Sequence, residues 1–252
     1  MSRGLTASAR VAGLLCVSAV TFAGPAAAQP RESRYSVWLN AGAQASMPAL
    51  TDRFTFEMHA EDAGVEAGYR SKAALLVDGG VAVRILRNIG VGVSISRFNG
   101  DARAGIAARI PYPFEFNRFR DVSGTSSALD HSELAYHVQL QYSRALTRRL
   151  RLVLSGGPTV FDLRRQLVTD VQVDEAYPFD TATFRSAGAR AAKGTGIGFH
   201  AGADVAWTFG RHAGIGALVR YARGTVDLEG PSRTTSVDAG GVQAGAGLRV
   251  YF

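Results

Sequence analysis

The sequence predicts an all-β protein, an antiparallel up-and-down transmembrane β-barrel of about eight strands that follows a cleaved N-terminal signal peptide. Three observations support this prediction. Eight segments alternate apolar residues with small or polar ones, which is the period-2 pattern of strands. The connections between these segments are alternately short and long. Beyond the N-terminus, no run of 18 or more apolar residues indicates a membrane helix.

The first 28 residues have the layout of a secretory signal peptide. Arg3 and Arg10 precede an apolar run over residues 11–22, and three alanines at 26–28 supply a small-residue cleavage site. The apolar run is too short for a membrane helix, and Gly24-Pro25 interrupts it. We therefore expect residues 1–28 to be removed and the remaining chain to form the barrel domain.

Composition excludes several classes of site. The only cysteine, Cys16, lies in the predicted signal peptide, so residues 29–252 hold no disulfide, thiolate metal site or Cys nucleophile. The formal net charge of +7 falls to about +5 without the two leader arginines. The basic residues are scattered along the chain, which favours anionic lipid headgroups over nucleic acid as their counter-charge. We expect no cofactor and no metal.

The first four predicted strands each set an apolar face against a polar or small one. Residues 35–42 alternate Tyr, Val, Leu and Ala with Ser, Trp, Asn and Gly. Residues 75–85 alternate Leu, Val and Ile with a face that contains Asp78, and residues 89–96 alternate Ile and Val with Gly and Ser. Residues 134–143 alternate Leu, Tyr and Val with Ala, His, Gln and Ser. Each pattern fits a strand with two different environments.

The last four predicted strands repeat this arrangement. Residues 150–155 alternate Leu with Arg, Val and Ser, and residues 197–207 alternate Ile, Phe, Ala, Val and Trp with Gly, His, Asp and Ala. Residues 215–222 alternate Ile, Ala, Val and Tyr with Gly, Leu, Arg and Ala. Residues 242–252 place Val, Ala, Leu and Phe opposite Gln, Gly, Arg and Tyr, over about the length that crosses a bilayer as a tilted strand.

The long connections span residues 43–74, 98–133, 162–195 and 223–241. Outer-membrane barrels have short periplasmic turns and long extracellular loops, and an even strand count places both termini on the periplasmic side. The second and third connections contain β-prone stretches at 110–117 and 168–173, which we interpret as hairpin extensions above the membrane. The prolines at 111 and 113 suit an edge strand. A ten-stranded barrel is the alternative.

A soluble β-sandwich or lipocalin-like barrel would instead bury the apolar faces. Two features favour the membrane barrel. The polar faces contain charged and imidazole side chains that suit a hydrated or ion-paired interior. Aromatic residues close the apolar faces near the short turns, as in an interfacial girdle. They are Tyr142, Trp207, Phe209 and Phe252.

The terminal L-R-V-Y-F resembles the end of small bacterial outer-membrane barrels of the OmpA-transmembrane-domain, OmpX and opacity-protein type. The resemblance covers the pattern of residues 29–252 but no loop motif, and the sequence corresponds to the barrel-only form. It implies a place in the bacterial outer membrane, with outer-membrane lipid, lipopolysaccharide and the barrel-assembly machinery as partners. It also assigns Leu248, Val250 and Phe252 to the assembly signal. This family is mixed in function, so the resemblance implies a fold and not an activity.

Six titratable residues fall on the faces predicted to line the lumen. A small barrel has an interior just wide enough for side chains, so buried charges there must pair. We interpret them as a network that closes the lumen; the alternatives are a proton or ion path through the two histidines, and metal binding by those histidines with one aspartate. The residues are Asp78, His137, His200, Asp204, Arg220 and Arg249.

Other candidate sites are weaker. His131, Ser132 and Glu133 form the one His/Ser/acid cluster, but adjacent strand residues point to opposite faces and cannot make a triad by themselves. Arginines in loops are more often solvated surface than a binding site, and if these have a partner, lipopolysaccharide phosphates are the ones expected. These are Arg103, Arg109, Arg118, Arg120, Arg185 and Arg190.

The leading hypothesis is a non-enzymatic outer-membrane barrel that stabilises the envelope or interacts with other surfaces through long extracellular loops. A lipid-modifying outer-membrane enzyme and a narrow channel are the alternatives. The sequence predicts no particular ligand, adhesion partner or oligomeric state.

Overall fold

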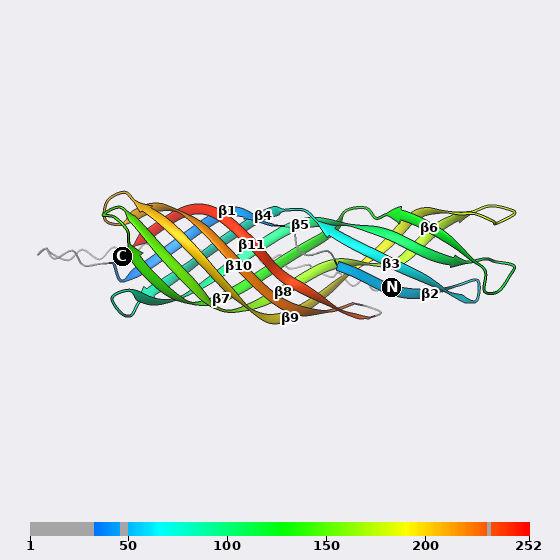
Figure 1. Cartoon of the computed structure of the whole chain (residues 1–252), viewed down its shortest axis with the longest axis horizontal. Coiled ribbons are helices and arrows are strands. Elements are labelled where there is room, and N and C mark those ends of the chain that lie inside the picture. Colours follow the sequence, from blue (N-terminus) through cyan, green and yellow to red (C-terminus); the bar gives the residue numbers. More distant parts are fainter. Residues whose placement is uncertain (1–32, 46–49, 231–232) are drawn as a thin grey trace, which may run out of the picture. The chain divides into compact units, whose positions relative to one another are not determined.

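The computed structural model describes residues 33–45, 50–230 and 233–252 and is built from antiparallel strands (Figure 1). The predicted signal peptide lies outside these residues. Within them, no helix is long and apolar enough to cross a membrane. The strands are β1 (Tyr35–Gln44), β2 (Leu50–Met58), β3 (Glu61–Ser71), β4 (Ala74–Arg84), β5 (Ile89–Pro111), β6 (Phe119–Thr125), β7 (Leu129–Ala145), β8 (Leu150–Glu175), β9 (Ala182–Thr208), β10 (Ala213–Glu229) and β11 (Thr234–Tyr251).

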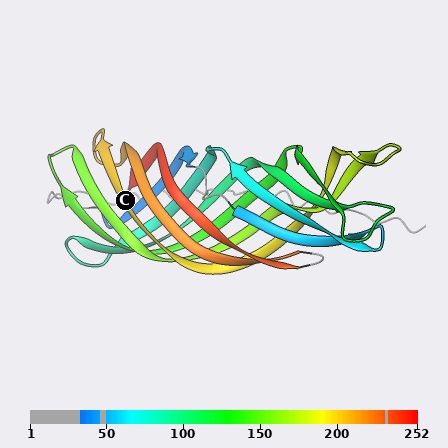
Figure 2. The ribbon, with the colours of Figure 1, turned by 45° about the vertical axis from the view of Figure 1, so that its right-hand side comes forward.

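Eight of these strands close into a ring, which confirms the predicted barrel (Figures 1 and 2). The order around the ring is β1, β4, β5, β7, β8, β9, β10 and β11, and β11 pairs back onto β1. Tyr35 and Phe252 exchange two backbone hydrogen bonds of 3.0 and 2.9 Å at this closing seam. The beginning of β1 and the end of β11 therefore lie together at the rim that carries the short turns.

The other three strands build an extension on the opposite rim, so the ten-stranded alternative is wrong. β3 pairs with residues 102–109 of β5 on one side, and β6 pairs with Gly105–Pro111 on the other. β2 adds to β3 through a two-residue turn at His59 and Ala60, both with positive φ as hairpin turns of this kind require. The long β8–β9 hairpin completes the extension.

These additional strands correct the loop predictions. The sequence did not indicate β2 and β3 within the first long connection. The stretch 168–173 lies in β8, as predicted, but β5 stops at Pro111, and residues 112–118 form the hairpin tip instead of continuing the alternation. Most of the predicted extracellular loops are thus extended strands joined by short tips.

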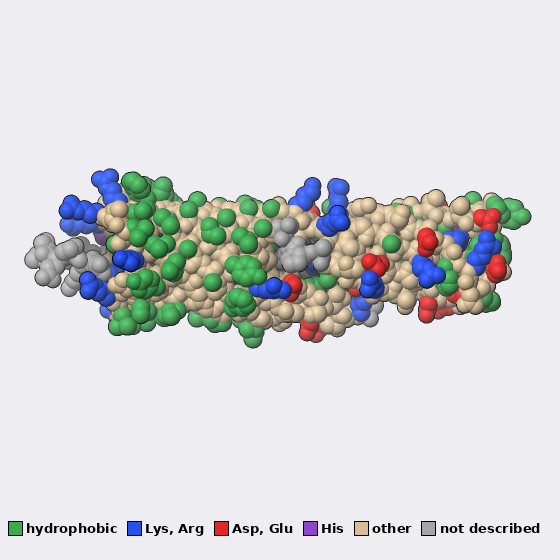
Figure 3. Space-filling view, in the orientation of Figure 1, with side chains coloured by type: hydrophobic (Ala, Val, Ile, Leu, Met, Phe, Trp, Pro, Cys, Tyr) green, Lys and Arg blue, Asp and Glu red, His purple; other side chains and the backbone are tan. Residues whose placement is uncertain are grey.

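The predicted register is correct, and the outside of the barrel changes character along each strand. In β7, Val138 is 57% exposed and its neighbour Gln139 only 5%. Along β5 the outward residues pass from Ile95 to Arg97, while the inward residues pass from Ser96 to Phe98. Figure 3 shows apolar side chains gathered over the barrel and charged ones scattered over the extension.

The main apolar core lies inside the extension and inside the end of the barrel that adjoins the extension. Burial of apolar surface therefore stabilises this region. The barrel interior between this core and the rim of the short turns is polar. The largest contributors to this core are Tyr69, Ile106, Ile110, Phe161, Leu163, Leu167, Val168, Val226 and Leu228.

Candidate functional site

An ion pair between Arg220 of β10 and Asp78 of β4 lies at the centre of the barrel lumen. Arg220 Nη1 is 3.0 Å from Asp78 Oδ2, and the two side chains are 3% and 0% exposed. Asn40 Nδ2 and Trp38 Nε1 donate to Asp78 Oδ1 at 2.9 and 3.1 Å. Two residues that the sequence placed on the same interior are therefore joined across it.

A second ion pair joins Arg249 of β11 to Asp204 of β9. Arg249 Nε lies 3.2 Å from Asp204 Oδ1, and Arg249 Nη1 donates to Asn40 Oδ1 at 2.7 Å. Because Asn40 also donates to Asp78, it links the two ion pairs. The sequence analysis missed Asn40, since nothing in β1 by itself shows which strands face it.

The two predicted lumen histidines share one hydroxyl group. Thr159 Oγ1 lies 2.8 Å from His137 Nδ1 and 2.9 Å from His200 Nδ1, and Ser96 Oγ lies 3.0 Å from His137 Nε2. The centroids of the two imidazole rings are 4.7 Å apart. In the described part of the chain, no group of three or more His, Cys, Asp or Glu could hold a metal ion, so Asp204 does not complete a site with them.

Glutamines continue the network toward the apolar core. Arg220 Nε donates to Gln243 Oε1 at 2.6 Å, Gln243 donates to Gln44 Oε1 at 2.7 Å, and Gln44 donates to the Gly240 carbonyl at 3.1 Å. The Gly240 amide in turn donates to Glu133 at 3.2 Å. Gly240 has a φ of +90°, and a Cβ there would lie 2.3 Å from the Ala222 carbonyl oxygen, so this link requires glycine.

The lumen contains small cavities. Two, of about 50 and 40 Å³, lie between the ion pairs and the rim of the short turns. Each can hold a water molecule or two. On the side of the network that faces the extension, the apolar core fills the interior. Charged side chains and packed apolar side chains therefore obstruct the described interior in series.

The His131, Ser132 and Glu133 cluster is divided between two faces, as strand geometry requires. His131 and Glu133 are 2% exposed, and Ser132 is turned outward. His131 lies on β7 beyond the exposed apolar side chains Tyr136, Val138 and Leu140. It packs against Phe98, with 5.5 Å between ring centroids. Burial, and then the charge of Arg165, lowers the pKa of His131 to about 4. Because His131 and Ser132 point to opposite faces of β7, the imidazole does not face the Ser132 hydroxyl.

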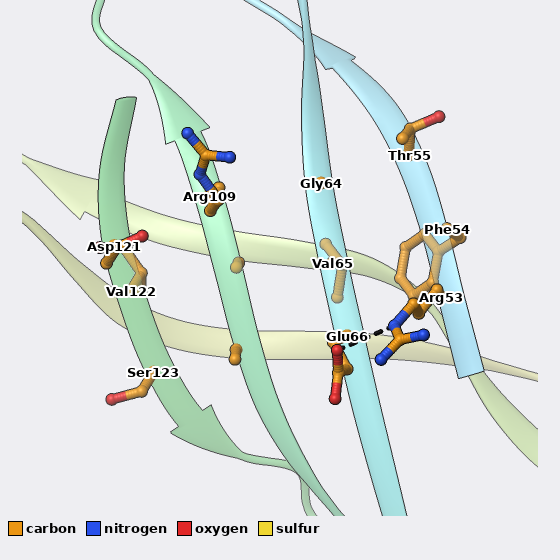
Figure 4. A pocket seen from close by; sticks show the side chains of 12 residues that line it. Arg53, Phe54, Thr55, Gly64, Val65, Glu66, Arg109, Asp121, Val122 and Ser123 are labelled. Carbon is orange, nitrogen blue, oxygen red and sulfur yellow. Dashed lines mark hydrogen bonds and ion pairs between the residues drawn. The ribbon is translucent and has the colours of Figure 1, made fainter. Parts of the chain in front are cut away.

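A shallow groove of about 780 Å³ lies on the outer face of β2, β3, β5 and β6 (Figure 4). Arg53 and Glu66 form an ion pair of 2.9 Å on one side, and Arg109 and Asp121 line the other. Gly64 leaves open space between them, because a Cβ built there meets nothing within 4 Å. Phe54, Val65 and Val122 also line the groove, so it offers apolar contacts beside the charged ones, and its lining contains no histidine.

The far end of the extension exposes a cluster of aromatic side chains. Rings at the β5–β6 and β8–β9 tips meet edge to face, with 5.4 Å between the centroids of Phe114 and Phe179. Phe114 and Phe116 are each 72% exposed, and Tyr177 is 86% exposed. We call this cluster the aromatic tip; its members are Tyr112, Phe114, Phe116, Tyr177 and Phe179. The first three belong to the stretch 110–117, which the sequence predicted as a strand and not as an exposed cluster, and only the folded structure adds the last two.

Polar bonds between the two loops hold the aromatic tip together. Tyr112 Oη donates to the Pro178 carbonyl at 2.9 Å. Arg118 lies over the Tyr112 ring and within 3.3 Å of both Glu115 and Asp180. Carboxylates predominate in segments 57–62, 112–120 and 174–185, which contain seven acidic residues against three arginines.

The loop arginines fall into two groups. Three of them, Arg118, Arg120 and Arg185, form ion pairs with acids at the tip. Arg103, Arg109 and Arg190 are exposed on the outer face of the extension.

The residues of the predicted assembly signal lie on the outer face at the closing seam. Leu248 and Phe252 are 60% and 63% exposed, and Val250 is partly exposed between them.

No protein-family model and no curated protein sequence matches this chain. Solved structures with a similar fold include the outer membrane protein OprG from Pseudomonas aeruginosa, with 12% identity, a TM-score of 0.46, and coverage of 88% of this chain and 98% of OprG. The outer membrane protease OmpT from Escherichia coli gives 8% identity, a TM-score of 0.49 and coverage of 88% and 98%. Ail, the attachment invasion locus protein of Yersinia pestis, gives 16%, 0.38, and 86% and 99%. These likenesses are distant and transfer no residue role.

Proposed function

We propose that this protein is a bacterial outer-membrane barrel with a non-enzymatic role, which holds a rigid extension outside the cell and presents the aromatic tip to a partner surface. The ring strands support the membrane location because they expose a continuous apolar belt, which includes Leu39, Val93, Leu140 and Val219. A soluble monomer rarely exposes so large an apolar surface. In this location the termini and short turns are periplasmic.

The aromatic tip is the observation that carries the proposed role. Large aromatic side chains that protrude into water gain free energy when a partner covers them, and aromatic residues dominate the binding energy of protein interfaces. The apolar core under the tip and the bonds between its loops keep it ordered before binding, which lowers the entropy cost of association.

The charge around the aromatic tip indicates the partner's chemistry. The excess of carboxylates there favours a surface that presents cationic groups, for example a lysine- or arginine-rich protein segment. Aromatic faces also attract such cations. The acidic tip and the phosphates of lipopolysaccharide would repel each other, which supports a tip held away from the cell's own surface.

Lipopolysaccharide is the proposed partner nearer the membrane. Outward basic residues follow the apolar belt on several ring strands, including Arg97 on β5, Arg164 on β8 and Lys193 on β9. Guanidinium groups bind phosphates in a bidentate manner. The exposed Arg103 and Arg190 lie further along β5 and β9.

The tip can be tested in intact cells. A Phe114→Ser/Phe116→Ser/Tyr177→Ser variant keeps the charge and should bind polylysine-coated beads less than the parent does, with no change on polyglutamate-coated beads. Ala107→Ser/Ala191→Ser/Thr195→Ser, on the outer face of the extension, is the matched control. Equal binding by parent and tip variant would contradict the proposed role.

The same cells can report which rim faces outward. A cysteine introduced by Asn117→Cys, between the tip aromatics, should react with a membrane-impermeant maleimide. Labelling only after the cells are broken would contradict the proposed orientation.

A further inference from the structure

The rim of the short turns is strongly basic. The turns 85–88, 146–149 and 209–212, with three residues on either side of each, contain seven arginines and no aspartate or glutamate. Arg34 lies beside them, because its carbonyl accepts a 2.8 Å hydrogen bond from the Arg84 amide. Basic side chains, drawn in blue, gather at this end of the molecule, the left end in Figure 3. The eight arginines are Arg34, Arg84, Arg87, Arg144, Arg148, Arg149, Arg151 and Arg211.

Each turn presents a large apolar side chain close to an arginine. The apolar members are each at least half exposed, and the arginines are exposed as well. In the described part of the chain, these three arginines form no ion pair. The three combinations are Leu86 with Arg87, Leu146 with Arg148, and Phe209 with Arg211.

Backbone hydrogen bonds fix how the turns hold these side chains. The Leu146 amide donates to the Leu150 carbonyl at 2.8 Å, and the Phe209 amide donates to the Ala213 carbonyl at 2.8 Å. Thr147 Oγ1 accepts from the Leu150 amide at 3.0 Å. The apolar and cationic groups of a turn are therefore presented together on a tight loop.

We propose that this rim binds the anionic headgroups of phospholipids in the leaflet that it faces. A guanidinium group pairs with a phosphate in a bidentate manner, while the neighbouring leucine or phenylalanine enters the acyl region below it. Arg87, Arg148 and Arg211, which form no ion pair with a described residue, would raise the local concentration of anionic lipid. The proposal rests on the membrane insertion proposed above.

An anionic cell-wall polymer is the other polyanion that could meet this rim. It would pair with the arginines but leave Leu86, Leu146 and Phe209 exposed to water. The repeated combination of an apolar side chain with an arginine therefore favours lipid.

Trp207 is a built-in reporter of lipid at this rim. It is 50% exposed on β9, two residues before Phe209, whereas Trp38, the other tryptophan, is bonded to Asp78 in the lumen. The full-length mature barrel would be folded into vesicles of equal phosphatidylcholine and phosphatidylglycerol, with bromine on the acyl chains of one lipid or the other. We expect brominated phosphatidylglycerol to quench Trp207 more strongly than brominated phosphatidylcholine does.

The Arg87→Gln/Arg148→Gln/Arg211→Gln variant should lose this preference, so that the two lipids quench equally. The matched control is Arg53→Gln/Arg109→Gln/Arg185→Gln on the extension, which removes the same charge and should keep the preference.

Equal quenching in the unmutated protein, or loss of the preference in the control as well, would overturn the lipid proposal. A rim variant that keeps the lipid preference but no longer sediments with peptidoglycan sacculi would assign the rim to the cell wall. Absence of quenching by either lipid would instead refute membrane insertion itself, and so the proposed function.

Discussion

The barrel and its extension are built from the same strands but are inverted with respect to each other. In the barrel the outward side chains are apolar and the interior holds charges, as at Val219 and Arg220. In the extension the outward side chains are polar and the interior is apolar, as at Asp227 and Val226. Both pairs belong to β10, so a single strand runs from the barrel into the extension and meets a different environment in each. The alternation continues without a break, and only the kind of residue on each face is exchanged.

This comparison teaches that the two regions are stabilised by different forces. The extension depends on the hydrophobic effect, as a soluble domain does. The membrane proposed around the barrel removes that driving force, so packing, backbone pairing and the internal ion pairs must hold it. The same type of substitution should therefore act differently in the two regions.

The largest effect is expected from breaking the central ion pair. Arg220→Ala leaves Asp78 buried without its cation, which should cost about 3–5 kcal/mol if the site is dry and less if water enters. Folding into lipid vesicles, followed by denaturant titration, measures this loss. Arg223→Ala is the control. Arg223 lies three residues after Arg220 on β10 and forms an exposed ion pair with Asp238 of β11. Equal effects at the two positions would contradict a closed, dry lumen.

The same variants can be recorded in planar bilayers. We expect little steady conductance from the unmutated protein and also from Arg220→Ala, because the apolar core obstructs the interior in series with the ion pairs. A large, stable, ion-selective conductance before mutation would favour the channel hypothesis instead.

An arginine on the apolar belt should have the next largest effect. Val138→Arg places a charge at mid-strand on the lipid face and should cost about 2–4 kcal/mol in a vesicle folding assay. In the extension, Ala107→Arg on the outward face should change stability by less than about 0.5 kcal/mol. If Val138→Arg is tolerated as well as Ala107→Arg, the outer faces of the two regions do not differ in environment.

Acid should destabilise the extension through His131. Its pKa of about 4 in the folded state is below the ordinary 6.5, so this group's contribution to stability is present above about pH 6.5 and is lost as the pH falls toward 4. We expect His131 to contribute a loss of about 2 kcal/mol between pH 7 and pH 5, measured as the difference between the unmutated protein and His131→Phe. The comparison is needed because burial raises the pKa of Glu133 to about 7, which acts in the opposite sense. Susceptibility of the extension to an acid-active protease measures it. His131→Phe should remove this part of the pH dependence, and an unchanged profile would contradict the assignment.

The smallest effect is expected from trimming the apolar core. Ile106→Val removes one buried methylene group and should cost about 0.5–1.5 kcal/mol, seen as faster proteolysis of the extension at constant barrel content. Ala107→Ser, the adjacent outward position, should change the rate little. A loss of barrel content with Ile106→Val would show that the two regions unfold together.

Much of the barrel followed from the sequence by itself, and the physical reason is local. A strand that separates two environments must alternate, so the eight ring segments, their outward faces and the inward placement of Asp78, His137, His200, Asp204, Arg220 and Arg249 could be read from period-2 patterns. The alternate short and long connections gave the topology. The division of His131 and Ser132 between two faces also followed from strand geometry.

Tertiary structure decided what depends on non-local contact. β3 is rich in Gly, Ala and charged residues, and it becomes a strand because residues 102–109 of β5 offer it an edge. β3 in turn offers an edge to the short strand β2. Asn40 and Thr159 acquire roles only when ring closure brings distant strands within hydrogen-bond distance. Tyr177 and Phe179 join Phe114 because the β8–β9 hairpin is long enough to reach the β5–β6 tip. Side-chain alternation is fixed residue by residue, whereas strand pairing across the ring is fixed only by the closed fold.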